Sequence, residues 1–309
     1  MRIEQELANI APGRETLLTV GVFDGVHAGH RYLIKRLNQR AQEEGLLSGI
    51  VTFNPHPQSV LQPHIRLPWL SSLEERIRSL RELGIGLVAL LSFTPEVAQL
   101  SAREFAALLK KYLKMHGLVI GPDFALGRKR EGDANLLDLL GQEMGFNMQV
   151  VSPFTVNGEI VSSTLIRQAL VQGDMMKVER LMGQYFTLSA RIISTDKRGR
   201  VLGFPTANLD IKPEQALPNN GVYGTITHVE GKQFASATNI GVRPTFGDNE
   251  KTVETHLIDY EGDLYGKELQ VKFICKLREE KHFASAEELK TQIKEDIKKV
   301  RAIAARELK

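Results

Sequence analysis

The sequence predicts two domains: an α/β domain with a doubly wound, mostly parallel sheet, followed by an all-β domain with one terminal helix. Two observations predict this division. Apolar strand-like runs alternate with helical patterns in the first half, whereas short β segments separated by turns follow one another from Tyr185 onward. A length of 309 residues also suits two domains, each with its own core. We place the boundary so that the domains span residues 1–183 and 184–309.

The expected elements follow from hydrophobic periodicity. In the first half we expect strands at 17–22, 50–53, 87–91 and 118–120, with helices after residue 30 and at 72–83 and 102–112. A helix at 174–182 precedes expected strands at 188–193, 222–227, 234–240, 252–258 and 269–277. These strands predict an antiparallel barrel or sandwich. The terminal helix, from about residue 286, carries one apolar stripe, composed of Leu289, Ile293, Ile297, Val300 and Ala304.

Composition excludes several classes of protein. Lys and Arg number 40 against 37 Asp and Glu, a balance that does not indicate a nucleic-acid partner. The only cysteine, Cys275, allows no disulfide within one chain, so we expect a reducing, cytoplasmic setting. The polar N-terminus is not a signal peptide, and the longest apolar run, 83–93, is too short to span a bilayer. The terminal helix shares its polar face between both charge signs, which favours packing on the barrel over a membrane surface.

The stretch Gly21–His30 organises the first domain. It reads Gly-Val-Phe-Asp-Gly-Val-His-Ala-Gly-His and joins an expected strand to an expected helix. His27 and His30 are three residues apart, so they share a face if the first turn is helical. A helix N-terminus binds phosphate well, and two imidazoles there can hydrogen-bond to a polyphosphate. The alternative is an ordinary strand–helix connection with two polar histidines. Neither a dinucleotide fingerprint nor a P-loop is present.

Three further polar stretches follow in the first domain. Asn54-Pro55-His56-Pro57 ends an expected strand, and its two prolines predict a rigid, extended exit; a plain strand stop is the alternative. The segment Gly127–Asp133 is either a mobile basic flap over phosphates or solvated charge. Ser163 or Thr164 predicts a helix N-cap, and together with Arg167 these hydroxyls can also bind phosphate.

The chemistry of the second domain centres on Gly199–Asn208, which contains Pro-Thr-Ala-Asn. The Thr206 hydroxyl and the Asn208 carbonyl oxygen are hard ligands of the kind that magnesium accepts beside substrate phosphates, although the motif alone is weak. Farther along, Val253 and Leu257 share one face of an alternating strand. Glu254 therefore faces the other way, toward solvent or a cleft.

The order of motifs resembles the bacterial bifunctional riboflavin kinase/FMN adenylyltransferase family, or FAD synthetases. In the first half the motifs are Gly-x-Phe-Asp-Gly-x-His-x-Gly-His, Thr-Phe-x-Pro-His-Pro, Gly-x-Asp-Phe-x-x-Gly and Ser-Ser-Thr-x-Ile-Arg. In the second half Pro-Thr-Ala-Asn is accompanied by Gly221–Gly224, Asn239–Thr245, Val253–His256, Asp263–Gly266 and Leu277–Phe283. The resemblance covers nearly the whole chain. It implies a Rossmann-like nucleotidyltransferase domain and a six-stranded riboflavin kinase barrel.

The resemblance also implies roles for individual residues. His27 and His30 would stabilise the transferring phosphate, and Glu254 would be the base on the ribityl hydroxyl. ATP and its phosphates in the adenylyltransferase would contact Gly21, Phe23, Asp24, Gly25, Gly29, Ser163, Thr164 and Arg167. Its flavin or nucleotide would contact Asn54, His56, Pro57, Asp123 and Phe124. The kinase would bind ATP and flavin through Gly199, Arg200, Gly203, Pro205, Thr206, Asn208, Tyr223, Asn239 and Arg243, with Mg²⁺ on Thr206 and Asn208.

The chain departs from the family pattern at several positions. Leu126 stands where Phe is usual, Ala190 where Gly is usual, and Ser194-Thr195 where His-Gly is usual; Gly183-Gln184-Tyr185 replaces Gly-Arg-Pro-Tyr.

The implied function is phosphorylation of riboflavin to FMN, then adenylyl transfer from ATP to FMN to give FAD. The partners are thus riboflavin, FMN, FAD and ATP, with no nucleic acid or membrane. Two rivals are a single-activity adenylyltransferase with a degenerate kinase domain and a non-enzymatic flavin-binding regulator. The oligomeric state is left open, with a homo-oligomer as one option.

Overall fold

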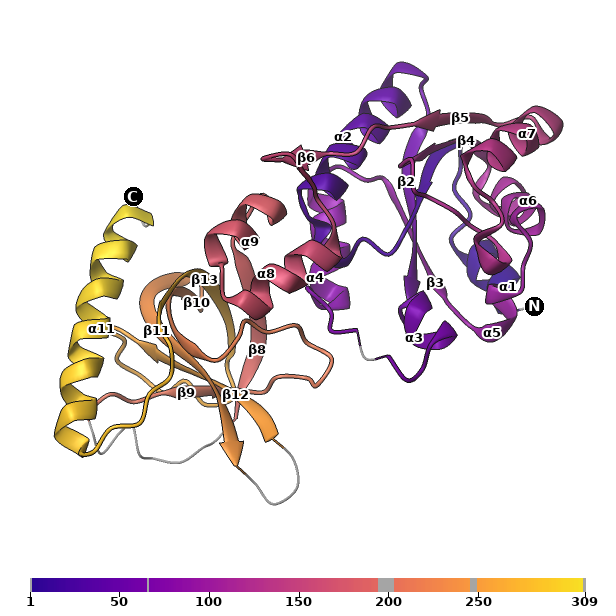
Figure 1. Ribbon diagram of the computed structural model, residues 1–309. Coiled ribbons are helices and arrows are strands. Elements are labelled where there is room, and N and C mark those ends of the chain that lie inside the picture. Colours follow the sequence, from indigo (N-terminus) through magenta and orange to yellow (C-terminus); the bar gives the residue numbers. More distant parts are fainter. Residues whose placement is uncertain (1, 66, 194–202, 245–248, 308–309) are drawn as a thin grey trace. The chain divides into compact units, whose positions relative to one another are not determined.

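The computed structural model describes residues 2–65, 67–193, 203–244 and 249–307. Its internal contacts divide the chain into two compact units, Met1–Ser162 and Ser163–Lys309. Each unit has its own sheet, and each is described separately below (Figure 1). Within the described ranges, no helix has the length and apolar character needed to cross a membrane.

The first unit is built on a five-stranded sheet with the order β3-β2-β1-β4-β5. The strands are β1 (Thr16–Val20), β2 (Leu47–Asn54), β3 (Leu87–Ser92), β4 (Met115–Ile120) and β5 (Asn147–Val150). Every neighbouring pair is parallel. The strand order reverses between β1 and β4, and ligands of such sheets bind in the crevice at that point, outside the carboxyl ends of the strands. The predicted parallel sheet is confirmed.

Helices cover both faces of this sheet. The helices are α1 (Arg2–Asn9), α2 (Ala28–Glu43), α3 (Pro57–Leu61), α4 (Leu73–Glu82), α5 (Pro95–Ala98), α6 (Ala102–Leu113) and α7 (Ala134–Met144). One core cluster joins α1, α6 and α7 to the sheet through residues such as Leu18, and the other joins α2 and α4 through Leu17. Adjacent strand residues thus point to opposite cores, which makes the sheet doubly wound. A short hairpin, β6 (Thr155–Val156) and β7 (Glu159–Ile160), follows β5.

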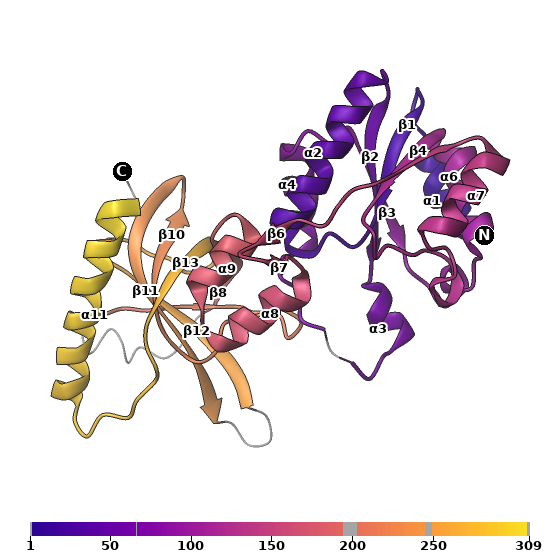
Figure 2. The same ribbon diagram turned by 45° about the horizontal axis from the view of Figure 1, so that its top comes forward.

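The second unit is a closed barrel with the strand order β10-β11-β12-β9-β8-β13 (Figure 2). Its strands are β8 (Phe186–Ile193), β9 (Ala207–Leu209), β10 (Gly221–Val229), β11 (Lys232–Pro244), β12 (Asn249–Leu257) and β13 (Glu268–Arg278). All pairs are antiparallel. The predicted six-stranded barrel is therefore confirmed.

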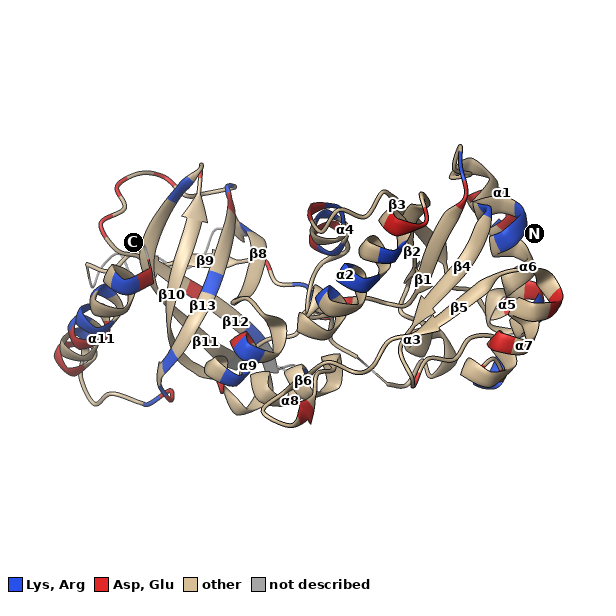
Figure 3. Ribbon diagram, turned by 90° about the horizontal axis from the view of Figure 1, so that it is seen from above, with Lys and Arg blue, Asp and Glu red and all other residues tan. Residues whose placement is uncertain are grey.

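Three helices of the second unit lie within the described residues. They are α8 (Ser163–Gln172), α9 (Met175–Met182) and the terminal α11 (Ala286–Glu307). The α9 helix packs against β8 and β13, and α11 packs against β10 and β11. Both basic and acidic residues occur along α11, as the sequence indicated (Figure 3). The compact units therefore divide after Ser162, whereas the boundary expected from sequence follows Gly183; α8 and α9 lie between the two positions.

A chain of hydroxyl groups runs through the barrel interior. Thr225 Oγ1 lies 2.8 Å from both Ser236 Oγ and Thr238 Oγ1. Thr227 Oγ1 lies 2.7 Å from Ser236 Oγ, and Thr238 Oγ1 lies 3.0 Å from Thr255 Oγ1. All these residues are buried. Their hydrogen bonds across β10, β11 and β12 offset the cost of removing polar groups from water.

Candidate active sites

The two histidines of the first unit lie at the turn between β1 and α2. His27 is the N-cap of α2, and its Nδ1 accepts a hydrogen bond from the His30 backbone N–H at 3.3 Å. The two rings stack with their centroids 3.6 Å apart. The prediction that these side chains share a face is therefore confirmed. Backbone N–H groups at a helix start can add donors for an anion beside the imidazoles.

The turn that carries the histidines has an unusual backbone. Phe23, Gly25 and Val26 have φ values of 55°, 74° and 40°. A left-handed conformation costs a β-branched residue such as Val26 roughly 1–2 kcal/mol, so surrounding contacts must hold it. At Gly25 the space is as restrictive as φ, because an added Cβ would lie 2.9 Å from Leu70 Cβ. Glycine is thus required at position 25.

His30 is held in its neutral form. Burial lowers the pKa of its imidazole well below the ordinary value, and the nearby His27 and Arg76 lower it further. The ring is partly exposed, but Nδ1 is enclosed and has no hydrogen-bond partner among the described residues. A neutral imidazole can still donate one N–H to a phosphate oxygen. Fixed positive charge at this site must therefore come from other groups.

Asp24 braces the turn. Its Oδ1 accepts hydrogen bonds from the backbone N–H groups of Leu70 at 2.9 Å and Ser71 at 3.3 Å, and the residue is 2% exposed. Ser71 Oγ in turn accepts from the Gly25 N–H at 3.1 Å. The segment before α4 therefore fastens the turn from both sides. The other glycines of the predicted phosphate set, Gly21 and Gly29, flank this turn.

The other predicted stretches of the first unit end at the same edge of the sheet. Asn54 ends β2, and Asp123 and Phe124 follow β4; both strands neighbour β1. Because the strands are parallel, their carboxyl ends meet at one edge, beside the histidine turn. Sequence reasoning placed all three stretches in one site, and the topology brings their strand ends together.

The exit from β2 differs from the prediction. Asn54–Pro55 is a cis peptide bond, and Pro57 begins the short helix α3 instead of prolonging an extended segment. His56 is the N-cap, with Nδ1 accepting from the Gln58 N–H at 3.0 Å. Proline suits the first position of a helix because its missing N–H has no partner there anyway. The expected extended exit is therefore wrong beyond His56.

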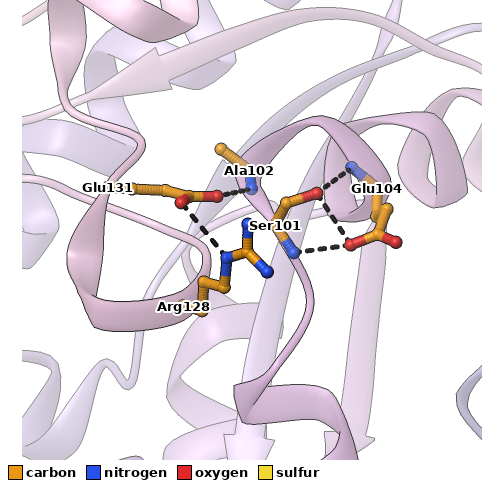
Figure 4. Close-up of polar contacts among 5 residues, drawn as sticks. All are labelled: Ser101, Ala102, Glu104, Arg128 and Glu131. Atoms are coloured by element: carbon orange, nitrogen blue, oxygen red, sulfur yellow. Dashed lines mark hydrogen bonds and ion pairs between the residues drawn. The ribbon is translucent and has the colours of Figure 1, made fainter.

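The basic segment Gly127–Asp133 is fastened to the start of α6. Glu131 Oε1 accepts from the Ala102 N–H at 3.0 Å, and Glu131 Oε2 lies 3.4 Å from Arg128 Nε (Figure 4). Ser101 and Glu104 form a capping box at the same helix end. An added Cβ at Gly127 would lie 2.5 Å from the Ala102 backbone nitrogen. The backbone is thus anchored, while the basic side chains remain exposed.

Arg130 links this segment to the predicted flavin stretch. Its Nη2 donates to the Asp123 carbonyl at 2.8 Å. Leu126, which stands where the family pattern has Phe, is buried among the α6 and α7 side chains. Ser163, Thr164 and Arg167 lie in the first two turns of α8. The helix begins at Ser163, so the predicted N-cap at Ser163 or Thr164 is wrong by one or two residues. Their part in a phosphate site stays a prediction.

A cavity of about 820 Å³ in the second unit holds several predicted kinase residues. Its lining includes Thr206, Asn239 and Glu254. Val253 and Leu257 are buried inside the barrel, and Glu254 faces away from them into the cavity, as the strand alternation predicted. Glu254 also pairs in register with Asn208 on β9 and with Asn239 on β11. Directly opposite residues point to the same face, so these three side chains form one row across the strands.

His256 lines the same cavity and was not among the predicted site residues. Its Nδ1 donates to the Pro205 carbonyl at 2.8 Å, and its ring meets Phe204 edge-on at 5.8 Å. The available signal was its position two residues after Glu254, which places both side chains on one face of the strand.

Other predicted kinase residues have different surroundings. Tyr223 is fully buried and does not line the cavity; its hydroxyl donates to Asn219, and burial raises its pKa. Gly203 has a φ of 85° at the start of the Phe204–Thr206 segment. Gly199, Arg200 and the departure at Ser194-Thr195 lie outside the described residues, and Arg243 is described only as backbone of β11.

The rest of the cavity lining includes the end of β13, the connecting segment 280–285 and α11. Arg278 and Asp296 both line the cavity, and Arg278 Nε lies 2.9 Å from Asp296 Oδ2. Asp296 is 2% exposed and lies within the predicted apolar stripe of the helix. Of that stripe, Val300 and Ala304 are buried, and Leu289 and Ile293 line the cavity. Sequence reasoning missed this ion pair.

Comparisons with known proteins match the two halves of the chain to two different family models. A family model described as FAD synthetase matches residues 10–165, and one described as riboflavin kinase matches residues 182–304. The chain is 38% identical over 308 residues to the bifunctional riboflavin kinase/FMN adenylyltransferase of Pseudomonas fluorescens, covering 99% of this chain and 98% of the relative. The relative of the same name from Escherichia coli (strain K12) is 38% identical, with 93% and 92% covered.

A more distant relative and a solved structure agree in extent. The protein of the same name from Listeria monocytogenes is 33% identical, with 94% of this chain and 93% of the relative covered. A crystal structure described as a macrolide-efflux protein from Streptococcus pneumoniae superimposes with a TM-score of 0.90 at 27% identity, covering 97% of each chain. The similarity in sequence and fold thus extends over both units.

Proposed function

Because the chain belongs to the family of bifunctional riboflavin kinases/FMN adenylyltransferases, we propose which residues perform each of its two reactions. The protein phosphorylates riboflavin with ATP to give FMN, and it transfers AMP from ATP to FMN to give FAD and pyrophosphate. One observation carries the assignment: each compact unit has its own set of chemical groups, the histidine turn in one and the Glu254 cavity in the other.

For adenylyl transfer, the proposed chemistry is positioning and charge stabilisation. His27 and His30 donate hydrogen bonds to the phosphate under attack, and the N–H groups at the start of α2 add to them. Asn54, His56, Asp123 and Phe124 hold the flavin and nucleotide at the neighbouring strand ends. For Ser163, Thr164 and Arg167 the proposed role is phosphate binding, with Arg167 suited to bidentate contact. We accordingly propose the functional boundary after Gly183; the first family model ends at residue 165 and the second begins at residue 182.

For the kinase reaction, Glu254 is the general base. It accepts the proton of the ribityl 5′-hydroxyl as that oxygen attacks the terminal phosphate of ATP. Its place in the row with Asn208 and Asn239 supports this role, because two amide side chains can orient its carboxylate and the substrate hydroxyl. The same row favours a working kinase over a degenerate domain or a purely regulatory flavin-binding protein.

The family uses ATP with a divalent metal, and we assign this metal as Mg²⁺. Within the described part of the chain no cluster of three or more His, Cys, Asp or Glu side chains could hold a metal by itself. A site with only a few protein oxygens suits Mg²⁺, because this ion keeps several waters and also binds substrate phosphates. Thr206 and Asn208 are the proposed protein ligands. When bound, the metal neutralises phosphate charge.

We also place the protein in the cytoplasm, because its single cysteine suits a reducing setting.

One assay tests the two reactions together. Purified protein is incubated with riboflavin, ATP and Mg²⁺, and the products are separated and identified. FMN should appear first and FAD later, and supplied FMN should yield FAD without riboflavin. Conversion of supplied FMN without any FMN formation from riboflavin would instead show a single-activity adenylyltransferase. Flavin binding without either product would show a regulator.

A further inference from the structure

Arg76 on α4 is a buried cation behind the histidine turn. The residue is 1% exposed. Its Nη1 donates to the Val22 carbonyl at 2.9 Å, and its Nη2 donates to the Phe53 carbonyl at 3.3 Å. Val22 lies two residues after the end of β1, and Phe53 lies near the end of β2. One guanidinium therefore ties together the two strand ends that lead to the histidine turn and to His56.

The segment that contains Arg76 also fastens the left-handed turn. Asp24 is bound by the Leu70 and Ser71 backbone N–H groups, and Gly25 by the Ser71 hydroxyl. Trp69 lies over the guanidinium, with the Arg76 Cζ 4.7 Å from the ring centroid. Since Val26 and Phe23 occupy costly backbone conformations, contacts of this kind are needed to hold the turn. Segment 69–76 supplies them.

The charge of Arg76 is not needed for these carbonyl contacts. A neutral donor could bind the same two oxygens, and a buried arginine is normally matched by a carboxylate. Here Nε has no acceptor among the described residues. Burial lowers the pKa of Arg76, while Asp24 and Glu74 oppose that effect, and a guanidinium stays protonated at any working pH. The positive charge is therefore permanent, and it contributes to keeping His30 neutral.

We propose that Arg76 is a positioning residue for adenylyl transfer: it holds the histidine turn and the β2 exit in register, and it places a permanent positive charge behind His30. This proposal rests on the proposed role of His27 and His30. Arg76 makes no contact with the reacting atoms in this scheme. Its positive charge attracts a polyphosphate to the site. The same charge opposes protonation of the imidazole, so that His30 acts as a neutral hydrogen-bond donor.

The expected pH behaviour depends on the groups around His30. The charges that act on His30 are those of His27 and Arg76. Other titratable or charged groups are Arg31, Tyr32, Lys35, Arg36, Arg40 and Glu43 on its own helix, Asp24 in the preceding turn, His56 after β2, and Glu74, Glu75, Arg78, Arg81 and Glu82 on α4. Removing the Arg76 cation raises the pKa of His30, because a like charge no longer opposes protonation. The acidic limb of the adenylyl-transfer rate must then move to higher pH. A purely structural arginine would not move that limb.

The experiment compares Arg76→Lys, Arg76→Met and Arg76→Gln in the full chain. Arg78→Met is the matched control, since Arg78 is exposed on the same helix. The rate of FAD formation from FMN and ATP is measured from pH 5 to pH 9, and FMN formation from riboflavin reports the second unit. We expect Met and Gln to lower kcat by roughly tenfold to a hundredfold and to move the acidic limb upward. Lys should lower kcat but leave the limb in place, and the kinase rate should not change.

Several outcomes overturn the proposal. One is equal loss of kcat in all three variants with an unmoved acidic limb, which would mean a structural role alone. Another is parent-like kcat in Arg76→Met or Arg76→Gln. If no replacement folds, as judged by cooperative unfolding, Arg76 serves folding and the proposal also fails. His30→Ala measured in parallel separates this proposal from its premise, because a parent-like rate in that variant would refute the histidine assignment instead.

Discussion

Asn208 and Glu254 lie directly opposite each other on the antiparallel strands β9 and β12. Their side chains consequently share a face, and Glu254 faces the cavity of the second unit. The proposed metal ligand and the proposed base are thus adjacent although 46 residues separate them in the sequence, from position 208 to position 254. The register of a three-residue strand, β9, decides this adjacency.

Glu254→Gln should separate the two activities. The amide cannot accept the ribityl proton, so FMN formation should fall by about 10²–10⁴, the usual contribution of a positioned base. FAD formation from supplied FMN should stay at the parent rate, because the substitution lies in the other unit. Glu268→Gln, at an exposed position on β13, is the control for changing a carboxylate. A simultaneous loss of both activities would point to misfolding instead.

His30→Ala should have the reverse effect. Loss of a preorganised hydrogen-bond donor typically lowers turnover by about 10²–10³, so FAD formation from FMN should fall by that amount. FMN formation from riboflavin should be unaffected. His116→Ala on β4 is the control, because the His116 side chain is 40% exposed and lies outside the turn. Adenylyl transfer within a few-fold of the parent would remove His30 from the mechanism.

The lowered pKa of His30 predicts acid sensitivity of the first unit. The folded protein protonates His30 only well below the ordinary value, whereas the unfolded chain does so near pH 6.5. Between these two pKa values the unfolded state binds the extra proton, so stability falls as pH drops below about 6.5. The contribution is at most about 1.4 kcal/mol per pH unit.

His30→Gln should flatten this dependence. The measurement is urea unfolding between pH 4.5 and pH 7.5, followed by the fluorescence of Trp69. Trp69 is the only tryptophan of the chain, so this signal reports the first unit. His64→Gln, at an exposed position, should leave the slope as in the parent. If the free energy of unfolding depended on pH equally in the parent and in His30→Gln, folding would not lower the pKa of His30.

Asp296→Ala should weaken both the barrel unit and riboflavin binding. Breaking a buried ion pair costs about 3 kcal/mol or more, because Arg278 would keep a desolvated charge without its partner. The KM for riboflavin should rise, since both side chains line the cavity. Asp259→Ala is the control: its ion pair with Arg301 is exposed and is worth about 1 kcal/mol or less. Circular dichroism during urea unfolding and kinase kinetics measure the two effects.

Two fragments test the division of the chain. Residues 1–162 and residues 1–183 should both fold, because the first sheet and its two cores lie within residues 1–162. Only the longer fragment should convert FMN to FAD, since it alone contains Ser163, Thr164 and Arg167. Adenylyl transfer by the shorter fragment at the parent rate would exclude α8 from the phosphate site. Loss of solubility in the longer one alone would show that α8 and α9 need the barrel.

Periodicity was sufficient to predict both fold classes and the direction of Glu254. Alternation over Val253–Leu257 decides which side chains enter the barrel, and this is a local property of the strand. The parallel sheet follows in the same way from regular alternation of apolar runs and helical patterns. The meeting of Asn54, the histidine turn and Asp123 at one edge then follows from topology, because parallel neighbours end on the same side.

The features that sequence reasoning missed depend on distant partners. Arg76 looks like a surface residue of an amphipathic helix, and its acceptors are 54 and 23 residues away, at Val22 and Phe53. Asp296 is a charged residue within an apolar stripe, and its burial is tolerated because it forms an ion pair with Arg278. β9 has three residues and becomes a strand only through its pairing with β8 and β12. From sequence alone, the basic segment Gly127–Asp133 could be a mobile flap or solvated charge. The anchoring of its backbone depends on the contact between Glu131 and Ala102, which the sequence does not reveal.

The hydroxyl chain inside the barrel restricts how this protein can diverge. Thr225 bonds to both Ser236 and Thr238, and Thr238 continues to Thr255. Replacing Ser236 by an apolar residue removes the hydroxyl partner of the buried Thr227, and replacing Thr238 does the same to Thr255, whereas replacing both partners together can be nearly neutral. Substitutions at these positions are therefore coupled. Among relatives, the pairs 227 and 236, and 238 and 255, should exchange polar for apolar character jointly, and an aligned set of sequences would display this as covariation across three strands.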